Sequence, residues 1–161
     1  MLLQKAYNSH YGRSMYAGNL RDWAKTAAVR FREEFGPEGE YENEYPIFVY
    51  SGMSGISAAV ALTQRLDGME FGMMYVRKPY EKSHGRGIET VGVKPPEDKK
   101  VRLVFVDDFI SMGGTAIRVF KKVQLDFLMK LDLDEMLIAF SDGSTCVPLS
   151  DNCAFATIKQ A

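Results

Sequence analysis

Short apolar segments alternate with amphipathic helical segments along most of this chain. The apolar segments, rich in valine, phenylalanine, isoleucine and methionine, cover residues 47–50, 71–76, 101–106 and 136–140. Their composition and length predict buried strands. Helical patterns cover residues 14–35, 56–66 and 115–131. Strands that alternate with helices form a parallel sheet with helices on its faces, because parallel neighbours need crossover connections. We therefore expect an α/β fold.

The first helical segment carries its apolar side chains at spacings of three and four residues. These positions are Leu20, Trp23, Ala24, Ala27, Phe31 and Phe35. This spacing places them on one face of an amphipathic helix, and we expect Trp23 to anchor that helix against the sheet. Gly36 and Pro37 are typical of a helix end.

Length, charge and cysteine content narrow the class of protein. A chain of 161 residues predicts one domain, and a net charge of −1 provides no overall field that would attract nucleic acid or an anionic membrane. The sequence shows neither a secretory signal pattern nor a run of ~20 apolar residues. Cys146 and Cys153 have no CxxC or histidine partner that would indicate zinc. We therefore expect a cytoplasmic protein with no nucleic-acid or membrane partner.

The turn after the third predicted strand combines two carboxylates with a loop of small residues. Sheets of this kind bind ligands beyond the carboxyl ends of their strands, which directs attention to residues 51–55, 77–87 and 107–115. In the last of these, glycines let backbone amides approach an anion closely and the following helix directs its positive end at the same point. Asp107 and Asp108 are adjacent, so their side chains should diverge, one toward sugar hydroxyls and one toward the turn or the water shell of a metal.

A simpler interpretation of this turn is that the acidic residues end a strand and the glycines cap a helix. Two adjacent acidic residues alone, or two adjacent glycines alone, would favour that interpretation. Here the apolar strand, the two carboxylates and the glycine and threonine of the loop occur in order over residues 104–116, which favours a phosphate site. The chain has no Walker A lysine after the glycines, and no GxGxxG follows a strand.

Residues 104–116 resemble the phosphoribosyl pyrophosphate (PRPP) signature of the type I phosphoribosyltransferase family. The resemblance implies that Asp107 and Asp108 face the ribose hydroxyls. It also implies that a set of loop residues holds the 5-phosphate, largely through backbone amides: Ser111, Met112, Gly113, Gly114 and Thr115. In the purine-specific branch the position of Ser111 often carries an aspartate that acts on the base, so the serine argues against that branch.

A second segment, residues 75–87, is similar to the catalytic loop of orotate phosphoribosyltransferases. It contains four cations, one histidine and two glycines, and such a loop suits a lid that closes over pyrophosphate. The resemblance implies catalytic roles for Arg77, Lys78, Lys82 and His84. The alternative is a solvated basic loop in which the histidine is an ordinary surface residue.

A third segment, residues 50–61, is similar to the pyrophosphate loop of the family and the helix behind it. The residues implied are Gly52, Met53, Ser54 and Gly55, whose amides would bind pyrophosphate at a helix start. Family members frequently place a lysine or arginine in this loop, whereas Met53 and Ser54 are uncharged. Either the loop works by its backbone alone or pyrophosphate binding is weakened, and a simple tight turn is the structural alternative.

The resemblance covers about residues 46–140 and implies a single domain over residues 1–161. A hood that selects the base would come from residues 1–45 and 141–161. The orotate enzymes usually carry an arginine just after the fourth strand, and residues 140–145 contain none. Orotate or another pyrimidine is therefore a lead for the acceptor.

The resemblance implies an enzyme that transfers ribose 5-phosphate from PRPP to a nucleobase and releases pyrophosphate. The implied cofactor is Mg²⁺, held mainly through substrate and water, with Asp107 or Asp108 as the candidate protein ligand. The implied partners are PRPP, a nucleobase and a second copy of the chain in a homodimer. Two alternatives stay open: a non-catalytic PRPP or nucleotide sensor, and an interaction module that only keeps the fold.

Overall fold

The computed structural model describes most of the predicted core. The described residues are 17–82, 87–92, 94–107, 114–127, 135–140 and 154–159. They form three helices and six strands. In chain order these are α3 (Ala17–Phe35), β1 (Glu44–Tyr50), α4 (Gly52–Thr63), β2 (Gly72–Val76), β3 (Ile88–Val91), β4 (Lys100–Asp107), α5 (Gly114–Phe127), β5 (Glu135–Phe140) and β6 (Ala154–Lys159).

The strands form one sheet in the order β3-β2-β1-β4-β5-β6. β2, β1, β4 and β5 run parallel to one another, whereas the edge strands β3 and β6 pair antiparallel with β2 and β5. The prediction of an α/β fold with a parallel sheet flanked by helices is confirmed.

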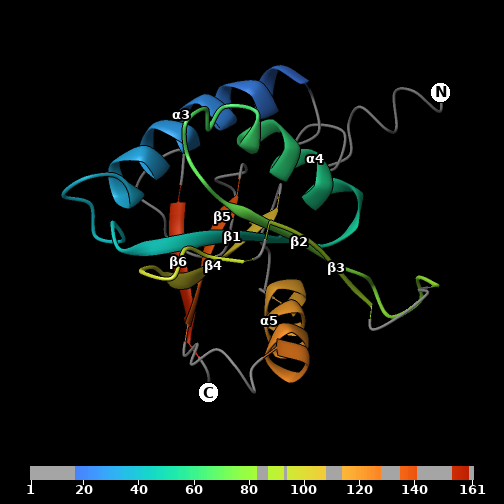
Figure 1. Cartoon of the computed structure of the whole chain (residues 1–161). Coiled ribbons are helices and arrows are strands. Elements are labelled where there is room, and N and C mark those ends of the chain that lie inside the picture. Colours follow the sequence, from blue (N-terminus) through green and yellow to red (C-terminus); the bar gives the residue numbers. More distant parts are fainter. Residues whose placement is uncertain are drawn as a thin grey trace.

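Helices cover both faces of this sheet. α3 and α4 lie on one face and α5 lies on the other (Figure 1). Because successive strand residues point to opposite faces, Phe48 packs with the first pair of helices, while Ile47 and Val49 pack with α5. β4 alternates in the same way. A strand covered on both faces must be apolar throughout, which is the pattern that the sequence shows.

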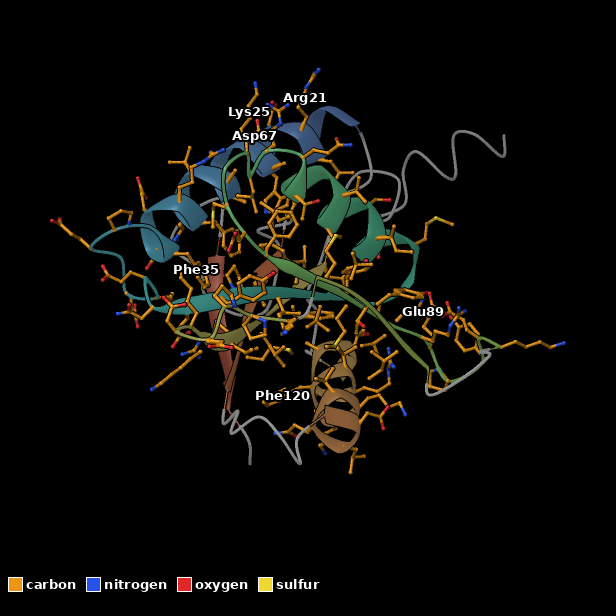
Figure 2. The ribbon with its side chains drawn as sticks, viewed as in Figure 1. Arg21, Lys25, Phe35, Asp67, Glu89 and Phe120 are labelled. Carbon is orange, nitrogen blue, oxygen red and sulfur yellow. The ribbon has the colours of Figure 1, made fainter. Side chains whose placement is uncertain are left out.

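The side chains of α3 divide by face as their spacing predicts. Figure 2 shows Phe35 on the side of α3 that faces the sheet, and Arg21 and Lys25 on the side that faces away. Trp23 is only 5% exposed and packs in the same cluster as Phe48, so the predicted anchoring role is confirmed. From the opposite face, Phe120 of α5 packs against the sheet (Figure 2).

The structure differs from the sequence-based prediction at one helix and at both sheet edges. α4 begins at Gly52 rather than at residue 56, so the predicted pyrophosphate loop is the first turn of a helix. β3 and β6 were not predicted. The side chains of β3 are half-buried or exposed, because an edge strand is held by backbone pairing rather than by an apolar run.

The segments expected to form the hood also have other roles. α3 packs on the sheet, and β6 extends the sheet by pairing with β5. The apolar face of α3 is buried against the core of the sheet. Residues 36–43 of the expected hood form turns that lead into β1, and residues 1–16, 141–153, 160 and 161 lie outside the described residues. Among the helices that the structure describes, none combines the length and the apolar character needed to cross a bilayer.

Candidate active site

Three of the expected site segments meet at the carboxyl edge of the parallel strands. β1 pairs with β2 on one side and with β4 on the other, all parallel, so the segments that follow them leave at the same edge. In the part of the chain that the structure describes, the buried polar residues are Ser51, 2% exposed, and Asp107, 7% exposed. Both lie at this edge. Burying a polar group costs free energy unless it is hydrogen-bonded, so each needs a partner.

Asp107 ends β4 and is hydrogen-bonded to the start of α4. The Ser54 hydroxyl donates to Asp107 Oδ1 over 3.1 Å. This bond joins the expected ribose site to the expected pyrophosphate site. Their residues are 53 positions apart in the sequence and come together because β1 and β4 are neighbours.

The start of α4 is not capped by the side chain of its N-cap residue. Ser51 occupies the cap position with extended backbone angles (φ −147°, ψ 135°), yet its side chain makes no capping hydrogen bond. Its hydroxyl oxygen instead accepts a hydrogen bond from Arg118 Nη2 over 3.0 Å. The first amides of a helix have no partner within the helix, and together they carry a partial positive charge. This helix start can therefore attract an anion.

Lys78 brings a full positive charge to the same place. A β-carbon added at Gly52 would lie 2.6 Å from Lys78 Cε and 2.9 Å from its Nζ, so the lysine side chain lies directly over the start of α4. Gly52 has φ +75°, a conformation that glycine adopts without strain. The expected pyrophosphate turn has no cation of its own. The structure supplies one from the segment after β2.

Glu81 holds the backbone beside Lys78. Its carboxylate accepts hydrogen bonds from the Lys78 amide at 2.9 Å and from the Tyr75 hydroxyl at 2.8 Å. The Glu81 amide in turn donates to the Lys78 carbonyl over 3.0 Å. The Lys78 amide, and after it the Tyr75 hydroxyl, lower the pKa of Glu81, so the carboxylate stays ionised at neutral pH. Burial, followed by the bond to Glu81, raises the pKa of Tyr75, which therefore remains a donor.

Arg77 closes the base of the loop that carries Lys78. Its guanidinium pairs with the Glu89 carboxylate and donates to the Lys82 carbonyl over 3.1 Å. Its amide donates to the Gly87 carbonyl over 2.9 Å. Figure 2 shows Glu89, which lies near the start of β3. In this structure Arg77 ties the two sides of the loop together, and Lys82 is exposed.

Arg118 is a site residue that sequence reasoning missed. It lies one helical turn after Gly114 in α5, and its Nη1 donates to the Arg77 carbonyl over 3.4 Å while Nη2 donates to Ser51. Its partners are 41 and 67 positions away in the sequence. No local pattern distinguishes this arginine from others on helices. Tyr75 and Glu81 were missed for a related reason, because their roles depend on the fold of the loop.

Several predicted site residues lie outside the described residues. These are His84, Asp108, Ser111, Met112 and Gly113. Gly114 and Thr115 are described as the first two residues of α5, and both are exposed. A β-carbon added at Gly114 would meet no atom of the described residues within 4 Å.

The described part of the site offers few protein ligands for a metal ion. Among the described residues no group of three or more histidine, cysteine, aspartate or glutamate side chains is placed to hold a metal ion. Asp107 is a single, nearly buried carboxylate at the site edge. Carboxylate oxygen suits Mg²⁺, which usually keeps several waters and binds one or two protein carboxylates together with substrate phosphates. The residues present therefore fit a magnesium ion held mainly by its substrate.

The described residues also outline a groove of about 570 Å³ at the opposite edge of the sheet. Phe35, Pro46 and Asp67 are among the residues that line it. Pro46 lies near the start of β1, so this groove is separated from Lys78 and Asp107 by the length of the strands. It is not part of the candidate active site.

The chain matches no protein-family model and no curated protein. Among solved structures it is similar to purine phosphoribosyltransferase from Pyrococcus horikoshii, with 24% identity over 83% of this chain and 80% of that one and a TM-score of 0.47. It is similar to hypoxanthine phosphoribosyltransferase from Trypanosoma cruzi, with 12% identity over 83% and 72% of the two chains and a TM-score of 0.49.

It is also similar to orotate phosphoribosyltransferase from Francisella tularensis, with 16% identity, 71% coverage of this chain, 49% coverage of that chain and a TM-score of 0.48. The chain thus spans about half the length of that orotate enzyme. These solved structures are phosphoribosyltransferases, the family that the sequence motifs resemble. These enzymes are named for different bases, so the likeness leaves the acceptor base open.

Proposed function

We propose that this chain transfers ribose 5-phosphate from PRPP to a nucleobase and releases pyrophosphate. The observation that carries the proposal is the meeting of Lys78, the uncapped start of α4 and the buried Asp107 carboxylate at one edge of the sheet. PRPP has a diphosphate at one end, hydroxyls on its ring and a phosphate at the other end. A cation with a helix start suits the diphosphate, and carboxylates suit the hydroxyls.

Each part of PRPP is assigned to one segment. The amides of residues 52–55, with Lys78 above them, bind the pyrophosphate. Asp107 and Asp108 bind the ribose hydroxyls, and residues 111–115 bind the 5-phosphate. The Ser54 bond to Asp107 keeps the first two subsites at a fixed separation.

The reaction is a displacement at the anomeric carbon. A base nitrogen attacks that carbon as its bond to the pyrophosphate oxygen breaks, and the bonding electrons leave with the pyrophosphate. Positive charge grows on the ribose ring, where the carboxylates of Asp107 and Asp108 stabilise it. Negative charge grows on the leaving group, where Lys78 and the α4 amides stabilise it, and Lys82 and His84 complete this environment. When bound, Mg²⁺ neutralises part of the pyrophosphate charge.

The proposed acceptor is a pyrimidine-like base, with orotate as the first candidate. Ser111 stands where the purine-specific branch often has an aspartate, and the residues similar to the orotate catalytic loop surround Lys78. The cytoplasmic location and the homodimer stay predictions.

A second candidate is a PRPP sensor without turnover. The described contacts that favour it are those of Arg77, because its guanidinium is already paired with Glu89 and bonded to the Lys82 carbonyl. Two uncharged residues in the pyrophosphate turn also favour it, and Met53 is 68% exposed. Binding of PRPP without release of pyrophosphate across all bases would identify this function.

The test measures pyrophosphate release from PRPP and Mg²⁺ with a panel of bases that includes orotate, uracil, hypoxanthine and guanine. We expect release with a pyrimidine-like base. Asp107→Asn should lower kcat/KM by at least about tenfold, because hydrogen bonds to charged groups contribute roughly 1.5–3 kcal/mol. Asp22→Asn makes the same chemical change at an exposed position on α3 and should stay within twofold of wild type. Absence of PRPP binding by wild type in calorimetry would refute the proposal.

A further inference from the structure

Arg118 contacts both of the segments that meet over the start of α4. It comes from α5, whose first residues end the expected 5-phosphate loop. Its two terminal nitrogens donate to the Ser51 hydroxyl at 3.0 Å and to the Arg77 carbonyl at 3.4 Å. One guanidinium thus links the helix after the phosphate loop, the residue before α4 and the residue before Lys78.

The bond to Ser51 has a consequence for α4. Serine is among the strongest capping residues, and at this position its hydroxyl would normally accept a hydrogen bond from the second or third amide of the helix, those of Met53 and Ser54. Ser51 has the extended backbone typical of a cap, but it makes no capping bond. Its oxygen is directed to Arg118 instead, and Ser51 is 2% exposed, so water does not easily replace that partner.

We propose that Arg118 is a positioning residue that withholds the Ser51 hydroxyl from the cap of α4 and so keeps the amides of Met53 and Ser54 open for the pyrophosphate of PRPP. This inference rests on the proposed function, because it assumes that pyrophosphate binds at α4. Without Arg118 the serine turns toward the amides of Met53 and Ser54 and competes with the substrate for them. The arginine acts through Ser51 and need not touch PRPP.

The competition between the Ser51 hydroxyl and PRPP for the α4 amides sets the size of the expected change in PRPP affinity. A serine cap stabilises a helix by an amount that corresponds to about a 5-fold change in an equilibrium constant, with a range of about 2-fold to 30-fold. Arg118→Ala should therefore weaken PRPP binding by at least this factor. Part of that loss comes from removing a positive charge near an anion. The double variant Arg118→Ala/Ser51→Ala has lost the same charge but cannot cap the helix, so it should bind PRPP about 5-fold more tightly than the single variant.

The experiment is calorimetry of the full chain with PRPP and Mg²⁺, together with amide hydrogen exchange of the free protein. Lys121→Ala removes the same charge from an exposed position of α5 and should bind PRPP within twofold of wild type. In the free protein, Arg118→Ala should slow exchange at Met53 and Ser54 because the serine then caps them, and the double variant should restore fast exchange. A purely structural role would instead speed exchange in the single variant.

The outcomes separate this inference from the proposed function. If wild type binds PRPP but the double variant binds no more tightly than Arg118→Ala, the inference is wrong and the proposed function stands. Faster exchange at Met53 and Ser54 in Arg118→Ala would also overturn it. If wild type binds no PRPP, the proposed function fails and this inference fails with it.

Discussion

Replacement of Gly52 by alanine tests whether Lys78 is placed over α4 for binding. The substitution acts in two ways. It puts a side chain on a residue with φ +75°, and it puts a β-carbon 2.6 Å from Lys78 Cε. The first effect concerns stability, and the second concerns the position of the ammonium group.

The two effects differ in size and can be separated. A left-handed backbone costs a residue with a β-carbon about 1–2 kcal/mol, and for a chain of this length each kcal/mol lowers Tm by roughly 2–4 °C. The lysine side chain is flexible at its end, so moving it adds little to the loss of stability. Displacing its charge from a bound anion costs about 1.5–3 kcal/mol, which is about a 10- to 150-fold loss of PRPP affinity.

Gly68→Ala is the matched control. Gly68 has φ +80°, and a β-carbon there would meet nothing within 4 Å, so the backbone cost is the same and no side chain is displaced. It lies after α4 and before β2, at the other edge of the sheet from Lys78. Lys78→Ala is the complementary variant, since it removes the charge without changing the backbone.

The assays are urea unfolding for stability and calorimetry with PRPP and Mg²⁺ for affinity. We expect Gly52→Ala and Gly68→Ala to lose similar stability, while only Gly52→Ala and Lys78→Ala lose PRPP affinity. If Gly52→Ala binds PRPP as tightly as Gly68→Ala, the placement of Lys78 over the helix start has no role in binding, and the reasoning is refuted.

Two further predictions concern the loop and the opposite edge. Bonds from the Lys78 amide and the Tyr75 hydroxyl lower the pKa of Glu81 in the folded chain from its ordinary 4.5. The ionised carboxylate therefore stabilises the fold fully above pH 4.5, and this stabilisation is lost as the pH falls through the lower pKa of the folded state. Glu81→Gln should lower the free energy of unfolding by at most about 1 kcal/mol at pH 7, because the carboxylate is near solvent, and by less at pH 4. Equal losses at pH 7 and pH 4 in urea unfolding would contradict this prediction. Arg102 pairs with Glu44 near the start of β1, with side chains 14% and 19% exposed. Arg102→Ala should cost about 1–3 kcal/mol in urea unfolding and leave PRPP affinity within twofold, and a tenfold loss of affinity would show that the two edges are coupled.

The layers of the fold were predictable from local pattern. A strand covered on both faces is apolar at every position, and a helix that packs on one face is apolar at every third or fourth residue. β4 and α3 both carry such patterns, so their type could be predicted without knowing their neighbours. β3 carries no such pattern, because backbone pairing along Tyr75 and Glu89 holds it at the edge.

The motifs predicted which segments carry the site, but not how their side chains combine. Sequence reasoning placed candidate residues in the pyrophosphate turn and in the basic loop, and it noted that the turn lacked a cation. It could not predict that Lys78 fills that place, because the lysine reaches Gly52 only when β1 and β2 are neighbours in parallel. The resemblance assigned Arg77 to catalysis, and that role stays a prediction; the pairing of its guanidinium with Glu89 could not be predicted from the sequence.

Local pattern was enough to predict the alternation of strands and helices, and with it the edge of the sheet at which the charged and glycine-rich segments gather. The bond of Ser54 to Asp107, and the bond of Arg118 to the Ser51 hydroxyl 67 positions away, became visible only in the folded chain. Periodicity is a property of neighbouring residues, whereas these bonds depend on strand order and register. Those are set by the packing of the whole chain.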